Sequence, residues 1–357
     1  MYDVVGNLHL HTTASDGSGT HDEVASAAVR AGLDFIIYTD HNTWTNGVEG
    51  WYHDSETGRD VLRLMGQEVN DQNLEPERNH LLCHFVCSDL NGVAAEPQGL
   101  IETVTRRGGL TFLAHPIEFK GHRDVELYPW VSWDISGFTG VELWNAMTNV
   151  KYRLKNVAIG LLGSYLPNWV LSGPFPEMLA KWDELLANGE KVVAIGNSDA
   201  HAMPITWKIF TRTIYPYEFC FRAVNTHLLL TEPLEREVDR ARRQIYNALK
   251  SGRCFVSYDM IASPTGFIFT GASGSNQEVM MGDTLTLQSE AVLRVHSPHK
   301  AKLRLLKDGK LLKETRSTHL EWRTTEPGVY RVEAYRRYWG QQRGWVFTNP
   351  IYIKKGE

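Results

Sequence analysis

Near its N-terminus the chain carries the stretch Asn7-Leu8-His9-Leu10-His11-Thr12-Thr13-Ala14-Ser15-Asp16-Gly17. A helical pattern and a second apolar run connect this stretch to Tyr38-Thr39-Asp40-His41. In a β-strand, alternate side chains share a face, so His9 and His11 point the same way while Leu10 turns into the core. Two imidazoles at a strand end, followed by the carboxylate of Asp16, pack poorly and suit a divalent metal ion. A lone His-x-His is usually incidental, so this interpretation depends on ligands from the rest of the chain.

A strand–helix–strand pattern starts at this stretch and recurs. Thr20 and Glu23 form a predicted capping box at the start of a helix, and Gly32 ends it. Strands are predicted at 3–11, 33–38, 61–68, 80–86, 109–116, 138–144 and 191–196. Further helices are predicted at 97–107, 151–166, 176–187 and 233–251. About seven strands alternating with helices predict an α/β fold with a parallel sheet, closed or nearly closed into a β/α barrel, over residues 1–258.

The pattern changes at about residue 259. Short alternating segments at 284–287, 291–296, 302–307, 330–335, 344–347 and 351–353 are separated by turn signals such as Asp308-Gly309 and Pro327-Gly328. Helical periodicity is lost there. We therefore predict a small antiparallel β-sandwich, an Ig-like accessory domain, over residues 259–357.

Composition narrows the class of protein. With 42% hydrophobic and 22% charged residues in 357, the chain is typical of a globular protein. The net charge of −5 disfavours nucleic acid as a partner without excluding it, because one basic groove can lie within an acidic total. Four cysteines without a CxxC pair indicate reduced thiols, no signal peptide is visible, and no apolar run reaches membrane-spanning length. A cytoplasmic location with no membrane partner is therefore expected, and the oligomeric state is not predicted.

Metal-ligating residue types recur at the ends of the predicted strands. They are His9, His11, Asp40, His41, Glu68, His80, His115, Asp199 and His201, with Asp16 in the loop after the first strand. The carboxyl ends of barrel strands share one face, so these side chains are expected to converge there. Each has a structural explanation by itself: His115 before Pro116 as a buried imidazole, or Asp199 as a helix cap. Such separate roles do not explain why strand after strand ends in His, Asp or Glu.

These motifs, in this order, resemble those of the PHP (polymerase and histidinol phosphatase) metal-dependent phosphoesterases. The resemblance covers residues 3 to about 257. It rests on His9-Leu10-His11 with Asp16, Thr39-Asp40-His41, Glu68, His80-Leu81-Leu82, Ala114-His115-Pro116 and Ser198-Asp199-Ala200-His201. The C-terminal part, ending in Trp345-Val346-Phe347-Thr348-Asn349-Pro350-Ile351-Tyr352, is similar to the branch that includes carbaryl hydrolase.

The resemblance implies a distorted seven-stranded β/α barrel that holds two or three divalent ions, Zn²⁺, Mn²⁺ or Fe²⁺. The first ion is expected on His9, His11, Glu68 and Asp199; the second on Glu68, His80 and His115; the third on Asp16, His41 and His201. Asp40 is expected to orient ligands from behind, because adjacent strand residues face opposite ways. His84 faces the same side as His80 and stays open as an alternative ligand or a pocket residue.

The expected reaction is hydrolysis by a metal-bridging hydroxide, with His9, His11, Glu68, Asp199 and His201 as the catalytic residues. The leading hypothesis is a phosphoesterase acting on a small or nucleotide-like substrate. The runner-up is an aryl ester or carbamate hydrolase. A hypothesis of another class is a non-catalytic binding protein stabilised by metal. Lys120, His122 and Arg123 are candidate phosphate or carboxylate binders, against the alternative of a solvated loop. The general acid is left open.

Overall fold

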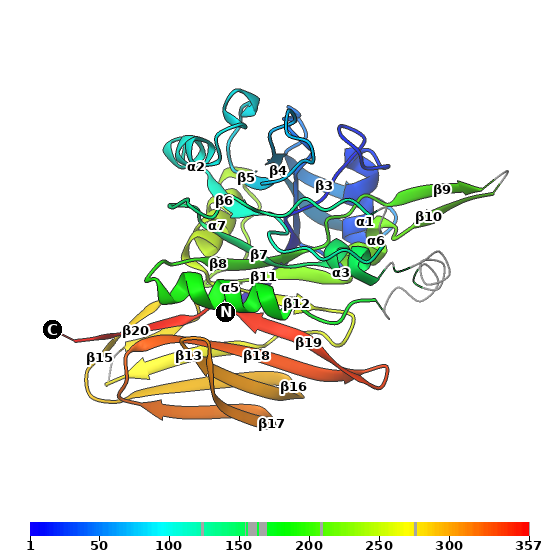
Figure 1. Ribbon diagram of the computed structural model, residues 1–357. Helices are drawn as coiled ribbons and strands as arrows, with labels where there is room; N and C mark the ends of the chain where they lie inside the picture. The colour runs from blue at the N-terminus through cyan, green and yellow to red at the C-terminus, as the bar shows by residue number, and fades with distance from the viewer. Residues whose placement is uncertain are drawn as a thin grey trace.

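The computed structural model describes residues 1–357 except 123, 124, 154, 156–162, 164–169, 208, 209, 275, 276 and 357. Figure 1 shows an N-terminal part of helices and strands stacked on a C-terminal part of strands alone. Seven strands of the N-terminal part overlap the seven segments predicted as strands. They are β1 (Tyr2–Asn7), β2 (Phe35–Tyr38), β4 (Arg59–Val69), β5 (Leu81–His84), β6 (Leu110–Leu113), β7 (Gly140–Asn145) and β8 (Val193–Asn197). The mixed α/β architecture in two parts is therefore as expected.

These seven strands pair in chain order from β1 to β8. A bridge between Leu10 and Ala200 joins the segments that follow β1 and β8, and the amide of His11 donates to the Ala200 carbonyl at 3.0 Å. The two ends of the series thus meet beside the histidines. A closed barrel stays a prediction, because this short bridge is not a full strand pairing and β1 pairs instead along its length with β11 (Val224–Leu230).

The sheet is not parallel throughout, which corrects the expectation. β5 runs antiparallel to both β4 and β6. No helix intervenes between β4 and β5, and a parallel neighbour would have needed a crossover connection. Because β5 is reversed, its beginning, not its end, lies at the edge where β4 and β6 end. His80, just before β5, therefore reaches that edge, whereas His84 lies at the opposite end of the strand.

Helix α1 (His21–Ala31) begins and ends as predicted. Thr20 accepts a hydrogen bond from the amide of Glu23, whose carboxylate accepts from the amide of Thr20, and Gly32 ends the helix with a φ of 92°. This positive φ favours glycine because other residues would be strained there.

Other helices match the predictions to differing degrees. α2 (Pro97–Arg106) and α5 (Pro176–Ala187) agree closely. α7 (Val238–Ser251) begins five residues late, because the carboxylate of Glu237 caps it by accepting from two amides. α3 (Ala146–Arg153) begins before the predicted helix at 151–166, most of which lies outside the described residues. No helix among the described residues is long and apolar enough to cross a membrane.

Several short elements were not predicted. β3 (Gly50–Asp54) forms a hairpin with β4, and β9 (Met203–Trp207) forms one with β10 (Phe210–Ile214). β11 and β12 (Cys254–Tyr258) extend the main sheet beyond β1. The one-turn helices η1 (Asn91–Val93) and α6 (Tyr217–Phe221) complete this part.

The C-terminal strands surround a separate apolar core that includes Phe269, Leu303 and Trp345. They are β13 (Ile268–Ser273), β14 (Gln277–Met280), β15 (Thr284–Leu287), β16 (Ala291–Lys307), β17 (Lys310–Thr324), β18 (Gly328–Tyr338), β19 (Gln341–Thr348) and β20 (Ile351–Lys355). Pairing is antiparallel except between β15 and β20, which are parallel. A sandwich and a domain boundary at 259 stay predictions, because β12 pairs with β19 and makes the sheet continuous across the boundary.

One predicted division of this part is wrong. The segments 291–296 and 302–307 belong to a single strand, β16, with a register shift between His296 and Ala301. Its first half pairs with β13 and its second half with β18. The bulge bends one strand between two neighbours, a role that short-range periodicity does not reveal. The predicted turn at Asp308-Gly309 is present, with φ values of 49° and 74°.

The two parts are joined by buried polar contacts. Asn349, which follows β19, receives a hydrogen bond from the amide of Ala194 in β8 at 2.8 Å and donates to the carbonyls of Ala194 and Cys254 at 2.9 Å. Arg331 of β18 binds both carboxylate oxygens of Asp183 in α5 at 2.7 and 2.6 Å. The C-terminal part thus packs on the strand and helix that precede Asp199.

Candidate metal centre

His9 and His11 extend from the end of β1 along the bridge to the segment after β8. The amide of Asp199 donates to the carbonyl of His9 at 3.0 Å, and Leu8 and Leu10 are fully buried in the core. The alternation therefore places both imidazoles on one side, as predicted. His9 Nε2 lies 3.1 Å from Glu68 Oε2 and 3.4 Å from Asp199 Oδ1; the corresponding distances for His11 Nε2 are 3.1 and 3.3 Å.

Glu68, at the end of β4, is the centre of the cluster. Its Oε2 atom faces His9, His11 and His41, the last through Nδ1 at 3.4 Å. Its Oε1 atom lies 2.9 Å from His80 Nδ1 and 3.0 Å from His115 Nε2. The two oxygens of this buried carboxylate thus face two different sets of imidazoles, which is the arrangement expected of a bridging ligand.

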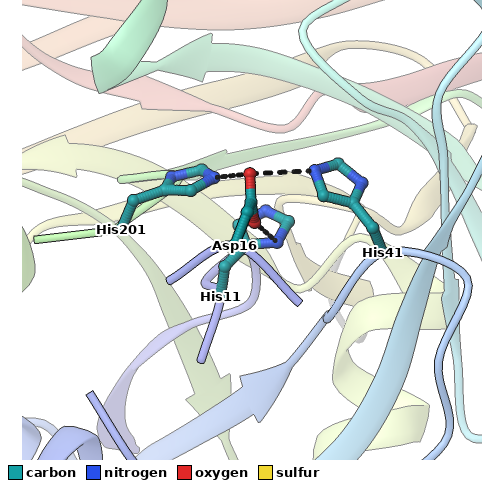
Figure 2. A group of neighbouring side chains, drawn as sticks. All are labelled: His11, Asp16, His41 and His201. Carbon is teal, nitrogen blue, oxygen red and sulfur yellow. Dashed lines mark ion pairs between the residues drawn. The ribbon is translucent and has the colours of Figure 1, made fainter. Parts of the chain in front are cut away.

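Asp16 gathers a second set of imidazoles at the mouth of the site. Figure 2 shows its carboxylate between His201 and His41, with His11 beside it. Asp16 Oδ2 lies 3.2 Å from His201 Nε2 and 3.7 Å from His41 Nε2, and Oδ1 lies 3.5 Å from His11 Nδ1. Unlike the other carboxylates, Asp16 has a side chain that is 54% exposed.

All nine predicted ligands fall into groups whose donor atoms lie within 4.8 Å of one another. The groups are His11, Asp16, His41 and His201; His9, His11 and Asp199; His9, Glu68 and His115; and His41, Glu68 and His80. These four groups do not coincide with the expected three sets of ligands. They place His41 with Glu68 and His80, His9 with Glu68 and His115, and His11 with Asp16. Which donors share an ion stays a prediction.

The donor set fits divalent metal ions. His11 Nε2 and His41 Nδ1 are buried and face Glu68, yet neither has a hydrogen-bond partner among the described residues. Buried polar atoms without partners are costly, so these two nitrogens fit the role of ligands that would hold a cation. Imidazole and carboxylate together are the ligands that Zn²⁺, Mn²⁺ and Fe²⁺ accept.

The electrostatics favour ionised carboxylates. Burial opposes the charged forms of Glu68 and Asp199, but the surrounding imidazoles, His9 foremost, outweigh it and hold the pKa of both carboxyls well below their usual range. Burial acts to lower the pKa of His9, but the carboxylates of Asp199, Glu68 and Glu142 raise it well above its usual value. Burial lowers the pKa of His41 to about 4. The carboxylates are thus negative over the whole physiological range.

Glu142 is a buried site residue that sequence reasoning missed. It lies in β7, and its Oε1 atom is 3.1 Å from His9 Nδ1. Asn145, Asn197 and the amide of His115 also donate to this carboxylate, at 2.9, 3.0 and 2.9 Å. It therefore holds the His9 ring so that Nε2 faces Glu68. The signal was present in the sequence, since Glu142 is a charged residue within a predicted strand and is flanked by Val141 and Leu143.

Asp40 lies behind the cluster, as expected. Its carboxylate accepts hydrogen bonds from the amide and hydroxyl of Thr12 at 2.7 and 2.9 Å and from the hydroxyl of Ser15 at 2.8 Å. It thus fixes the loop that carries Asp16.

The remaining candidates are more distant. His84 is fully buried at the far end of β5, its ring nitrogens have no partner among the described residues, and burial lowers its pKa to about 3. Lys120 lines a neighbouring cleft, His122 lines neither that cleft nor the metal cleft, and Arg123 lies outside the described residues.

The metal cluster opens into a cleft of about 620 Å³. Two further lining residues were not anticipated. Tyr128 stacks on the His80 ring, with centroids 5.0 Å apart, and Lys151 of α3 places its Nζ atom 4.7 Å from the centre of the Tyr128 ring. Lys151 also pairs with Glu118 at 3.0 Å. An aromatic ring and an ammonium group thus stand at the wall of the cleft, where a substrate would contact them.

Comparison with known proteins gives low similarity. No family model and no curated protein matches the chain. A two-domain protein from Bacteroides vulgatus, which contains a predicted PHP-like metal-dependent phosphoesterase, is 14% identical with a TM-score of 0.46, over 98% of this chain and 95% of that one.

Two other solved structures align with 59% of this chain and 92% of their own. A candidate metal-dependent phosphoesterase from Bifidobacterium adolescentis is 15% identical with a TM-score of 0.35. An amidohydrolase from Chromobacterium violaceum, with bound sulfate and no metal, is 12% identical with a TM-score of 0.30. The function is therefore inferred from the side chains of this chain.

Proposed function

We propose that this chain is a metal-dependent hydrolase that cleaves phosphoesters of a small or nucleotide-like substrate. The observation that supports it is the set of nine donors, drawn from seven segments between Asp3 and His201, gathered at the base of a cleft. Three carboxylates and six imidazoles in largely buried positions serve packing poorly. Their cost in desolvation is offset when they bind cations.

The charge of the site favours a phosphoester over the runner-up, an aryl ester or carbamate. Asp16, Glu68 and Asp199 carry about three negative charges, and neutral imidazoles add none. With the carboxylate of Glu142 beside His9 counted as well, two divalent ions would leave the site about neutral and three would leave it at about +2, by simple addition. With three ions, the positive cluster attracts an anionic phosphate more strongly than a neutral ester. Divalent ions held there supply Lewis acidity and lower the pKa of water.

The described residues divide into three roles in this proposal. His9, His11, Glu68, Asp199 and the other members of the four groups hold the ions. Glu142 and Asp40 keep the ligands oriented through the contacts given above. Tyr128 and Lys151 would contact the substrate, the ring beside an organic group and the ammonium beside a phosphate oxygen. His201, whose side chain is 16% exposed at the cleft, is the most exposed of the five predicted catalytic residues.

A substrate panel tests the proposal. Protein purified without added metal would be analysed for its metal content and assayed with p-nitrophenyl phosphate, bis(p-nitrophenyl) phosphate, 1-naphthyl acetate and 1-naphthyl methylcarbamate. We expect turnover of a phosphoester to exceed that of either naphthyl substrate. Faster hydrolysis of the naphthyl esters would favour the runner-up. Bound metal without turnover of any substrate would favour the non-catalytic binding protein.

A matched pair of variants tests the ligand assignment. His80 directly precedes β5 and His84 ends it, and of the two His80 contacts Glu68. We expect His80→Ala to lower phosphoester turnover at least about 100-fold and to weaken metal retention, whereas His84→Leu keeps both. Circular dichroism would verify that each variant is folded. Equal losses in the two variants would contradict the assignment.

A further inference from the structure

A concave basic surface lies on the C-terminal strands and shares no lining residue with the metal cleft. It encloses about 600 Å³. The charged residues that line it are Lys300, Lys302, Arg316, Arg336 and Arg337, with Glu314 as the opposing charge. Five cations and one carboxylate give this surface, the basic cleft, a formal charge of +4 in a chain whose total is −5. Such segregation of charge points to an anionic partner.

The strand register shows that the cations are not neutralised by their neighbours. Across β17, β16 and β18, Arg316, Lys302 and Tyr335 are directly opposite one another. Like charges opposite each other on a sheet are destabilising. In the row two residues along, Glu314, Arg304 and Glu333 are opposite one another and form ion pairs at 3.6 and 2.8 Å. A row with two carboxylates and one guanidinium therefore lies next to a row with two cations and no carboxylate.

Several N–H groups of these cationic side chains make no hydrogen bond or ion pair within the part of the chain that the structure describes. Lys302 pairs with Glu314 at 2.9 Å, but Glu314 is shared with Arg304. Among the described residues, the hydrogen bonds of Arg336 and Arg337 go to the backbone carbonyls of Lys300 and Gly340. Arg316 has no ion-pair partner among the described residues. These groups retain donors for phosphate oxygens.

One aromatic side chain lines the cleft, and a second lies in a turn flanked in sequence by lining residues. Tyr335 lines the cleft. Trp339 lies in the β18–β19 turn between the lining residues Arg337 and Gly340, and it is 54% exposed. Large exposed aromatics are unusual on a solvent-facing turn, and a basic groove with aromatic platforms is the pattern that binds unpaired nucleotides.

We propose that the basic cleft binds a short single-stranded nucleic acid, with successive phosphates along the cations and a base stacked on Trp339. The cations lie on three neighbouring strands, which are spaced about 4.8 Å apart, so they suit a chain of phosphates better than one phosphate. A cleft of this volume is too small for a duplex, about 20 Å wide. The site is independent of the proposed hydrolase activity.

Binding to the full chain would test the proposal. The probe is fluorescein-labelled hexathymidylate with phosphorothioate linkages, which resist hydrolysis, followed by fluorescence anisotropy at several salt concentrations. The variant Arg316→Ala/Arg337→Ala removes two cleft cations. The control Arg294→Ala/Lys313→Ala removes two exposed cations from β16 and β17 outside the cleft. We expect the cleft variant alone to lose at least tenfold in affinity and to flatten the slope of log K against log salt by about 1.4.

Trp339→Ala tests the aromatic contact separately. It is expected to weaken binding at least about fivefold at every salt concentration while the salt slope stays unchanged. Hydrolysis of p-nitrophenyl phosphate should be the same in all these variants. The proposal is overturned if the probe does not bind at 50 mM salt, or if cleft and control variants bind equally. Displacement of the probe by dextran sulfate as effectively as by unlabelled oligonucleotide, at equal charge, would also overturn it.

Discussion

His227 offers a quantitative test of how the two parts of the chain are held together. This buried imidazole lies between two carboxylates, with Nδ1 2.8 Å from Asp3 Oδ1 and Nε2 3.1 Å from Asp259 Oδ1, and it stacks on Phe255. Burial acts to lower its pKa, but Asp259 and Asp3 outweigh that effect and raise the pKa from 6.5 to about 10. The charged imidazolium therefore links the first strand to the segment that begins the C-terminal part.

The sign of the pH dependence follows from the raised pKa. The folded chain binds one proton more than the unfolded chain between pH 6.5 and 10, so stability is fully present below 6.5 and is lost as the pH rises toward 10. With these two pKa values, the contribution falls by about 2.5 kcal/mol between pH 7.5 and 9.5. His227→Gln cannot bind this proton, so it is expected to lack that part of the decline.

The measurement is the free energy of unfolding by urea, followed by tryptophan fluorescence at several pH values from 7.5 to 9.5. The quantity compared is the difference between the parent chain and the variant, because all other titrating groups are common to both. His53→Gln is the matched control: His53 also contacts a carboxylate, Asp60 at 2.7 Å, but its side chain is 63% exposed. If His227→Gln declined with pH as steeply as the parent chain and the control, the reasoning would be refuted.

Three further expectations concern single residues. Glu142→Gln removes the charge that orients His9 and should weaken metal affinity about 10- to 100-fold, measured by competition with a chelator, while the exposed Glu56→Gln leaves it unchanged. Asp183→Ala takes two charged hydrogen bonds from the buried Arg331 and should lower the free energy of unfolding by about 2–3 kcal/mol; an unchanged urea midpoint would contradict this. Gly196→Ala would bring a methyl group within 2.2 Å of Val256 Cγ1, so thermal unfolding should reveal a loss of about 1–3 kcal/mol, whereas Gly92→Ala, with open space, should show none of that size.

The strands and helices were predicted well where periodicity and end signals agreed. α1 is the clearest case, since Thr20, Glu23 and Gly32 mark both of its ends locally. The reversed β5 was not predicted, because strand direction depends on the connection and the neighbours rather than on the strand's own residues. β16 was divided in two for a similar reason, since its bulge interrupts the alternation without ending the strand.

The candidate site shows the same limit. Its nine donors were recognisable because they follow strand after strand, and the structure brings all nine into contact groups. Glu142 lies within a strand rather than at its end, and Lys151 and Tyr128 lie on segments without a motif. Their roles depend on which strands become neighbours, and single residues in the sequence do not carry that information.

The amide of Asn349 has a consequence for the order in which the chain can mature. β8 carries Asp199 and His201 just beyond its end, and Asn349 satisfies the amide and carbonyl of Ala194 within that strand. The 154 residues between Ala194 and Asn349 must be synthesised before the side chain of Asn349 can bind this strand. The strand that presents two of the ligands therefore lacks these hydrogen bonds until residue 349 has been made. Loss of Asn349 would therefore be expected to loosen β8 and to disturb the two ligands that follow it, although they lie far from residue 349 in the sequence.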